Sequence, residues 1–147
     1  MAVSITESPV VLRRGRELVS PGLFERLGVF CSEEYGLERG VADRVMDQAL
    51  AFVYVLGSQK AYDMAPSERV DPGWHAFMLH TQEYAAWCQE QFGAFVHHAP
   101  NSRVRTRPLM VSVADRIAAA GFAVDARLWG AAADCNQPAC CGDGDGC

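Results

Sequence analysis

The chain has 147 residues, of which 50% are hydrophobic and 21% are charged. A chain of this length has room for one domain that buries roughly two-thirds of its unfolded surface, and its ordinary composition excludes wholesale disorder and a fibrous protein. The formal net charge of -5 disfavours binding to nucleic acid, since proteins that bind it place Lys and Arg against phosphates. We therefore expect one globular domain that binds no nucleic acid.

The sequence shows neither the pattern of a secretory signal peptide nor a run of about 18 apolar residues that could cross a membrane. These absences predict a cytoplasmic protein without a membrane association. In a reducing compartment, the six cysteines are more typical of free thiols or metal ligands than of a disulfide framework.

Two helices are predicted in the first half of the chain. After an N-terminal arm, residues 1–19, Ser20 and Pro21 supply a helix cap and a proline at the first helical position. Gly36 is placed to end this helix. A second helix is predicted over residues 38–62, because apolar side chains recur at the helical period of 3.6 residues. The apolar positions of the second helix are Val41, Val45, Ala49, Phe52, Val53 and Leu56.

Asp71 and Pro72 repeat the cap-and-proline pattern and predict a third helix over residues 72–92, which Gly93 ends. A fourth helix is predicted from Leu109 to a stop at Gly121, followed by one further turn over residues 124–129 that docks onto the bundle. The predicted fold is therefore all-α: a small bundle of four main helices in residues 20–133, followed by a flexible tail rich in Cys and Gly in residues 134–147.

The segment 70–100 holds all four histidines and two of the three tryptophans, so we expect the function to reside there. His75 lies in the first turn of its helix, where the helix dipole favours the neutral imidazole that binds metals or accepts protons. A hydrogen bond from His75 to a loop carbonyl is the alternative. His75 and His80 point about 140° apart on a helix and are poorly placed to bind one ion together. The Asp71 carboxylate has a structural explanation as a cap for the backbone N–H of Trp74.

His97 and His98 follow Gly93 closely, so one of them could lie beside Cys88. Along a straight helix the distance from His75 to Gly93 is about 27 Å, whereas the four extended residues that follow Gly93 reach back only about 14 Å. This predicts two separate small sites, with Cys88 and a histidine at one end and His75 at the other. Packing or solvent exposure is the alternative for both histidines. A Cys88 nucleophile with His98 as its base is also conceivable, although Cys88 is predicted on a buried face.

The tail offers a second source of metal ligands, because thiolates bind zinc, copper(I) and iron–sulfur clusters. Its spacing matches none of these sites well, since two adjacent cysteines are awkward ligands for one ion. Redox-active thiols and thiols without a role are the alternatives. We call this set the tail cysteines: Cys135, Cys140, Cys141 and Cys147.

Segments 70–75 and 81–88 read V-D-x-x-W-H and T-x-x-Y-x-x-x-C, and Gly93, His98 and Pro100 follow. This pattern resembles the glycine-rich domain-containing protein-like family over about residues 24–100. The resemblance implies a small helical domain, and family members often end in a tail rich in Gly and Cys. Many members carry a second histidine two residues after the first; Phe77 stands there in this chain, which weakens a His-x-His chelate. The matching positions are Asp71, Trp74, His75, Tyr84, Cys88, Gly93, His98 and Pro100.

The function predicted from the sequence is the binding of a transition metal, with zinc favoured and copper or iron as alternatives. A protein-interaction module without a metal is the second hypothesis, and a small enzyme that depends on a metal or a Cys–His pair is the third. No nucleophile elbow, phosphate-binding loop or dinucleotide motif is present, so the catalytic residues are unknown. The candidate metal ligands are His75, Cys88, His97, His98 and the tail cysteines.

Overall fold

A computed structural model describes residues 9–99 and 107–130. Within these ranges the protein is all-α, as predicted, with one isolated bridge between Arg13 and Phe122 and no β-strand. The elements are the 3-10 helix η1 (Gly15–Leu18), the α-helices α1 (Pro21–Tyr35), α2 (Arg39–Gln59), α3 (Asp71–Leu79), α4 (Thr81–Phe92) and α5 (Arg107–Ala119), and the 3-10 helix η2 (Ala126–Trp129).

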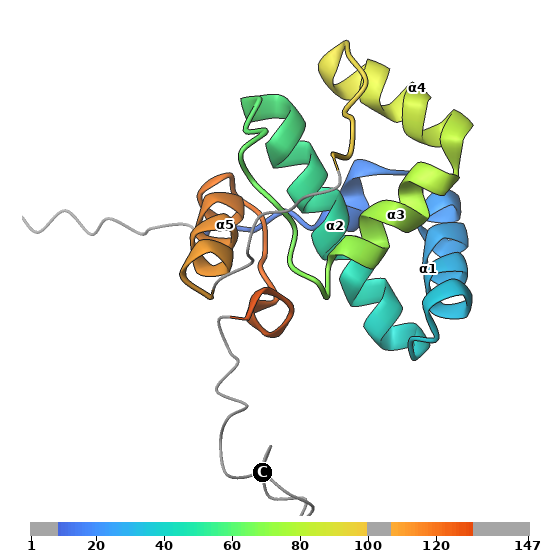
Figure 1. Ribbon diagram of the computed structural model, residues 1–147, viewed down its shortest axis with the longest axis horizontal. Helices are drawn as coiled ribbons and strands as arrows, with labels where there is room; N and C mark the ends of the chain where they lie inside the picture. Colours follow the sequence, from blue (N-terminus) through green and yellow to red (C-terminus); the bar gives the residue numbers. More distant parts are fainter. Residues whose placement is uncertain (1–8, 100–106, 131–147) are drawn as a thin grey trace, which may run out of the picture.

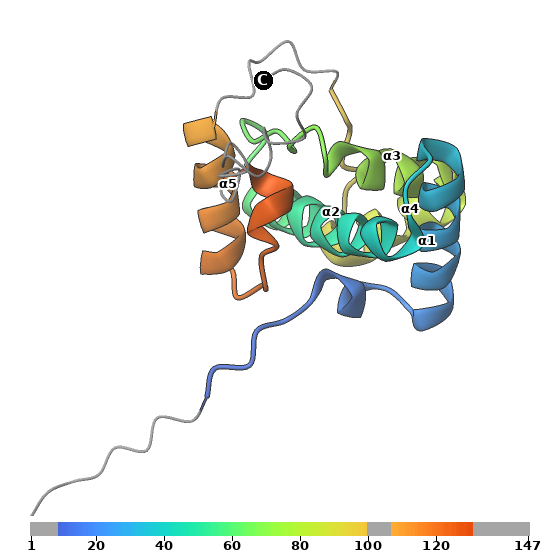
Figure 2. The same ribbon diagram turned by 90° about the horizontal axis from the view of Figure 1, so that it is seen from below.

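Helix α2 is the centre of the fold (Figures 1 and 2). Helices α1, α3 and α4 lie on one side of it, and α5 with η2 lies on the other. Nearly every residue of α2 from Val45 to Gly57 is buried, which is the pattern of a helix surrounded by other elements rather than one that faces solvent. The two polar residues in this stretch are bonded: Asp47 to Arg16 of η1, and Gln48 to the loop before η2.

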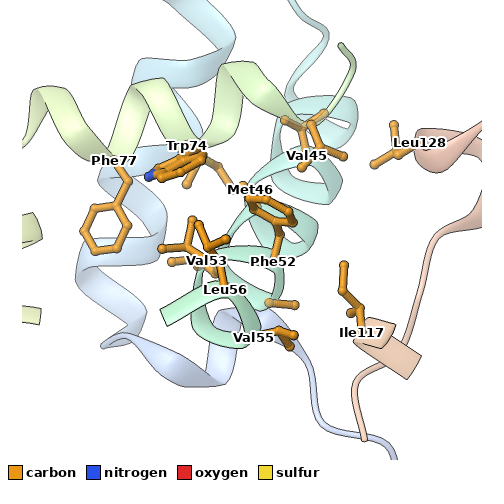
Figure 3. Close-up of a cluster of buried hydrophobic side chains, with 14 of the residues drawn as sticks. Val45, Met46, Phe52, Val53, Val55, Leu56, Trp74, Phe77, Ile117 and Leu128 are labelled. Carbon is orange, nitrogen blue, oxygen red and sulfur yellow. The ribbon is translucent and has the colours of Figure 1, made fainter. Parts of the chain in front are cut away.

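The hydrophobic core joins the two sides of α2 (Figure 3). The Phe52 ring lies 5.6 Å from the Trp74 ring of α3 and 5.8 Å from the Trp129 ring of η2, measured between centroids. Trp129 is fully buried and Leu128 almost so, which confirms that the turn predicted at residues 124–129 docks onto the helices. Most of the apolar stripe predicted for the second helix is also buried.

The caps predicted from sequence form at the ends of α1. The Ser20 hydroxyl oxygen accepts a hydrogen bond from the Leu23 N–H at 3.2 Å, and Gly36 takes the left-handed conformation with φ of 64°. Helix α2 ends at Gln59, earlier than the predicted Tyr62, because Lys60 adopts φ of 52° and its N–H bonds back to the last turn.

The predicted third helix is wrong, because it is two helices that meet at His80. A continuous helix would bond the His80 N–H to the Ala76 carbonyl. Instead, His80 Nδ1 lies 2.7 Å from the Ala76 carbonyl oxygen, and the His80 N–H bonds to the Phe77 carbonyl. The His80 side chain thus takes the place of the backbone donor, and the chain turns a corner with ψ of 66°. Figure 1 shows α4 running back from this corner, away from the line of α3.

Part of the predicted N-terminal arm is built into the domain. Gly15 of η1 is buried against α2, and a Cβ at this position would collide with the backbone carbonyl of Asp47. Among the helices described, none is both long and apolar enough to cross a bilayer. The predicted Cys/Gly-rich tail lies outside the described residues.

Candidate metal centre

Three side chains converge near the N-terminal end of α3: Asp71, His75 and His98. His98 Nε2 lies 2.9 Å from Asp71 Oδ1 and 3.1 Å from His75 Nε2, and His75 Nε2 lies 3.6 Å from Asp71 Oδ1. Within the described parts of the chain, this is the one group of three or more His, Cys, Asp or Glu side chains whose ligand atoms meet. We call it the His–Asp cluster.

Helix α3 supplies two of the three candidate ligands from one face. Asp71 and His75 are four residues apart, a spacing that places both side chains on the same side of a helix. The N-terminal turn of α3 packs closely on α2: a Cβ added to Gly73 would lie 2.7 Å from the Ala49 Cβ. Glycine at position 73 therefore allows the close approach that fixes where the two ligands point.

The third candidate ligand, His98, is brought in by the segment that follows α4. This segment runs back toward α3 in both ribbon views. Two hydrogen bonds among buried groups hold it: the Trp74 Nε1–H donates to the Tyr84 hydroxyl at 3.0 Å, and that hydroxyl donates to the Val96 carbonyl at 2.6 Å. Burial raises the pKa of Tyr84 well above its ordinary value, so its proton stays available for this bond. The Trp74 ring also packs against the His98 ring at 4.3 Å.

The prediction that neither His97 nor His98 could reach His75 is wrong. The estimate assumed a straight helix, whereas the corner at His80 and the turn at Gly93, with φ of 67°, fold the chain back on itself. Asp71 is the first residue of α3, and Val70 occupies the cap position before it. The Asp71 carboxylate, which was expected to cap the helix, has its Oδ1 atom 2.9 Å from His98 Nε2.

The remaining predicted ligands are not brought together. Cys88 is completely buried and is not part of the cluster. His97 is exposed, and its ring packs on Phe95 at 4.7 Å. Among the described residues, Cys88 therefore belongs to no group of three or more possible metal ligands. The tail cysteines lie outside the residues that the structure describes.

The dimensions of the cluster suit a tetrahedral metal ion. Its three ligand atoms are separated by 2.9, 3.1 and 3.6 Å. Ligands bound at about 2.0–2.2 Å in a tetrahedron lie about 3.3–3.6 Å apart. An ion about 1 Å above the plane of the three atoms would contact all of them with little movement, leaving a fourth position for water or another ligand.

The cluster is buried on one side and open on the other. The side chains of Asp71 and His98 are 18% and 13% exposed, whereas that of His75 is 44% exposed. Solvent and small molecules therefore have access from the His75 side. Half-burial also strengthens the attraction between the carboxylate and a cation, because the surroundings screen less than bulk water.

Asp71 is the member of the cluster that was not among the predicted metal ligands. The sequence contained an indication of this role, since Asp71 and His75 have the i, i+4 spacing of two ligands on one helical face. An aspartate at the start of a helix is also typical of a cap, and this explanation was preferred. No local pattern indicated that His98 is the third member.

No curated protein and no solved structure matches this chain. One family model, described as UCP032817-like, matches residues 21–112. The match covers more than half of the chain and includes all three members of the His–Asp cluster as well as Trp74 and Tyr84. The protein belongs to the UCP032817-like family.

Proposed function

We propose that this protein binds one zinc ion through Asp71, His75 and His98. The observation that carries the proposal is the convergence of two imidazole nitrogens and a carboxylate oxygen within 3.6 Å of one another. Two histidines and one carboxylate with an open fourth position is the ligand set of catalytic zinc sites rather than structural ones. The same set also serves iron(II), and imidazole suits copper, so these two metals are the alternatives.

Hydrogen bonds between the three side chains would pair their polar atoms less completely than a bound metal ion would. The Nε2 atom of His98 lies near both Asp71 Oδ1 and His75 Nε2, and a single N–H on it can point well at only one of them. A metal ion uses one lone pair from each of the three atoms at once. This favours a metal over a purely hydrogen-bonded group of side chains.

Elemental analysis of the full-length protein, purified without an affinity tag under reducing conditions, tests the proposal. We expect about one zinc per chain, retained when the tail cysteines are all replaced by serine, and lost in His98→Ala. His97→Ala is the matched control, because His97 is the neighbouring residue, is exposed and lies outside the cluster.

Two results would contradict the proposal. A fully folded wild-type protein that contains no metal and takes up none from added zinc would overturn it. Metal that persists in His98→Ala and disappears from the variant without the tail cysteines would move the site to the tail. Iron or copper in place of zinc would keep the site and change the metal.

The other functional hypotheses stay predictions. These are a protein-interaction module without a metal, a small enzyme, a cytoplasmic location and kinship with glycine-rich domain-containing proteins. The burial of Cys88 disfavours the enzyme that would use it as a nucleophile, since a nucleophilic thiol must be accessible. An enzyme built on the zinc site is compatible with the open side of the cluster.

A further inference from the structure

A small hollow lies beside the His–Asp cluster on its exposed side. It has a volume of about 210 Å³ and is lined by Tyr35, His75, Met78 and Leu79. His75 belongs to both features: its Nε2 atom faces the cluster, while its half-exposed ring forms a wall of the hollow. Met78 and Leu79 supply apolar surface. A ligand bound at the open position of a metal in the cluster would therefore have this hollow next to it.

Tyr35 adds a polar group to the lining of the hollow. A tyrosine hydroxyl has an ordinary pKa of about 10, so the phenol of Tyr35 is protonated at neutral pH and can donate a hydrogen bond. No partner for this hydroxyl is found among the residues in the described ranges, although the ring is half-buried. The hollow thus combines an apolar wall with one donor that a ligand could use.

The volume limits what the hollow can hold. An apolar cavity of about 150 Å³ is enough for a benzene ring. A hollow of about 210 Å³ can therefore take one six-membered ring and a short connecting group. Nucleotides and other drug-sized molecules occupy sites of roughly 300–1,000 Å³, so they are too large to be held by this hollow alone.

We propose that the hollow is the ligand pocket of the metal centre, and that it takes a small molecule in which an oxygen-containing metal-binding group is joined to one apolar ring. This inference rests on the zinc proposal above. The metal-binding group would occupy the open position at the cluster, and the ring would lie against Met78 and Leu79. Tyr35 would donate a hydrogen bond to the oxygen group.

The test compares two probes on the zinc-loaded full-length protein by calorimetric titration: benzohydroxamate and acetohydroxamate. They share the zinc-binding group and differ in the ring. We expect benzohydroxamate to bind at least about tenfold more tightly, because the ring moves apolar area out of water. In Leu79→Trp, which fills the hollow, this preference for benzohydroxamate over acetohydroxamate should disappear.

Leu79 is a suitable position because its side chain is 59% exposed, so a larger residue should not disturb folding. Leu12→Trp is the matched control, since Leu12 is 48% exposed and does not line the hollow; it should keep the preference. Zinc content is measured for each protein before titration.

The outcomes separate the two proposals. A protein that binds no zinc overturns both. Stoichiometric zinc with equal affinity for the two probes would contradict the pocket proposal and agree with the metal-site proposal. A preference for benzohydroxamate that is retained in Leu79→Trp would show that the ring binds elsewhere, and would also contradict the pocket proposal.

Discussion

Tyr84→Phe is the substitution that tests most directly how the fold builds the cluster. The hydroxyl of Tyr84 accepts a hydrogen bond from the Trp74 Nε1–H and donates one to the Val96 carbonyl. Removing this single oxygen should loosen the segment that carries His98 while the rest of the side chain stays in place. The ring contacts of residue 84 with Phe77 and Phe95, at 5.1 and 5.2 Å, should be retained.

The expected loss of stability follows from the two broken bonds. Trp74, Tyr84 and Val96 are all at least 95% buried, so the indole N–H and the carbonyl would be left without partners in the protein interior. Each buried group without its hydrogen bond costs about 1–3 kcal/mol. We expect the free energy of unfolding to fall by roughly 2–4 kcal/mol, which a domain with about 5–15 kcal/mol can tolerate.

Urea denaturation followed by circular dichroism measures the stability, and competition with a chromophoric chelator measures the zinc affinity. Changes to residues that orient metal ligands typically weaken metal binding by about 10- to 100-fold, and we expect a loss in this range. Tyr62→Phe is the matched control, because the Tyr62 side chain is 61% exposed; it should change neither quantity.

Two outcomes would refute this reasoning in different ways. Unchanged stability would mean that the hydrogen bonds to Trp74 and Val96 contribute nothing to folding. A loss of stability with unchanged zinc affinity in the folded protein would mean that Tyr84 supports the core without positioning His98.

Three further predictions concern packing, cysteine chemistry and pH. Gly73→Ala should lower the free energy of unfolding by about 1–3 kcal/mol, because its Cβ would lie 2.7 Å from the Ala49 Cβ; Gly22→Ala, with nothing within 4 Å of the new Cβ, should be neutral or slightly stabilising in the same urea titration. Burial, reinforced by the nearby Asp43 carboxylate, raises the pKa of the Cys31 thiol to about 11, so mass spectrometry should find Cys31 unalkylated by iodoacetamide at pH 8 in the native protein and alkylated in urea; rapid native alkylation would contradict its burial. Zinc affinity, measured by chelator competition, should fall as the pH is lowered, because protons compete for the ligand atoms of the His–Asp cluster; an affinity independent of pH would argue against histidine ligands.

The sequence by itself determined most of the helices and where they end. The Ser20 cap, the left-handed glycines at positions 36 and 93, and the apolar stripe of the central helix were all predictable. Each depends on interactions between residues no more than about four positions apart, which the order of the amino acids records directly. The pair Asp71 and His75 belongs to this class as well, since their spacing places them on one helical face.

Only the tertiary structure decided that Asp71, His75 and His98 meet. No proline or glycine marks the corner between α3 and α4; it forms because the His80 side chain replaces a backbone donor at the Ala76 carbonyl and packs against the Phe30 ring at 5.1 Å. That corner lets the later segment return and places His98 beside His75, 23 residues earlier in the chain. A contact across so many residues depends on every turn between them. For this reason the local pattern predicted that His75 and His98 lie in two distant places, whereas the folded protein brings them into one cluster.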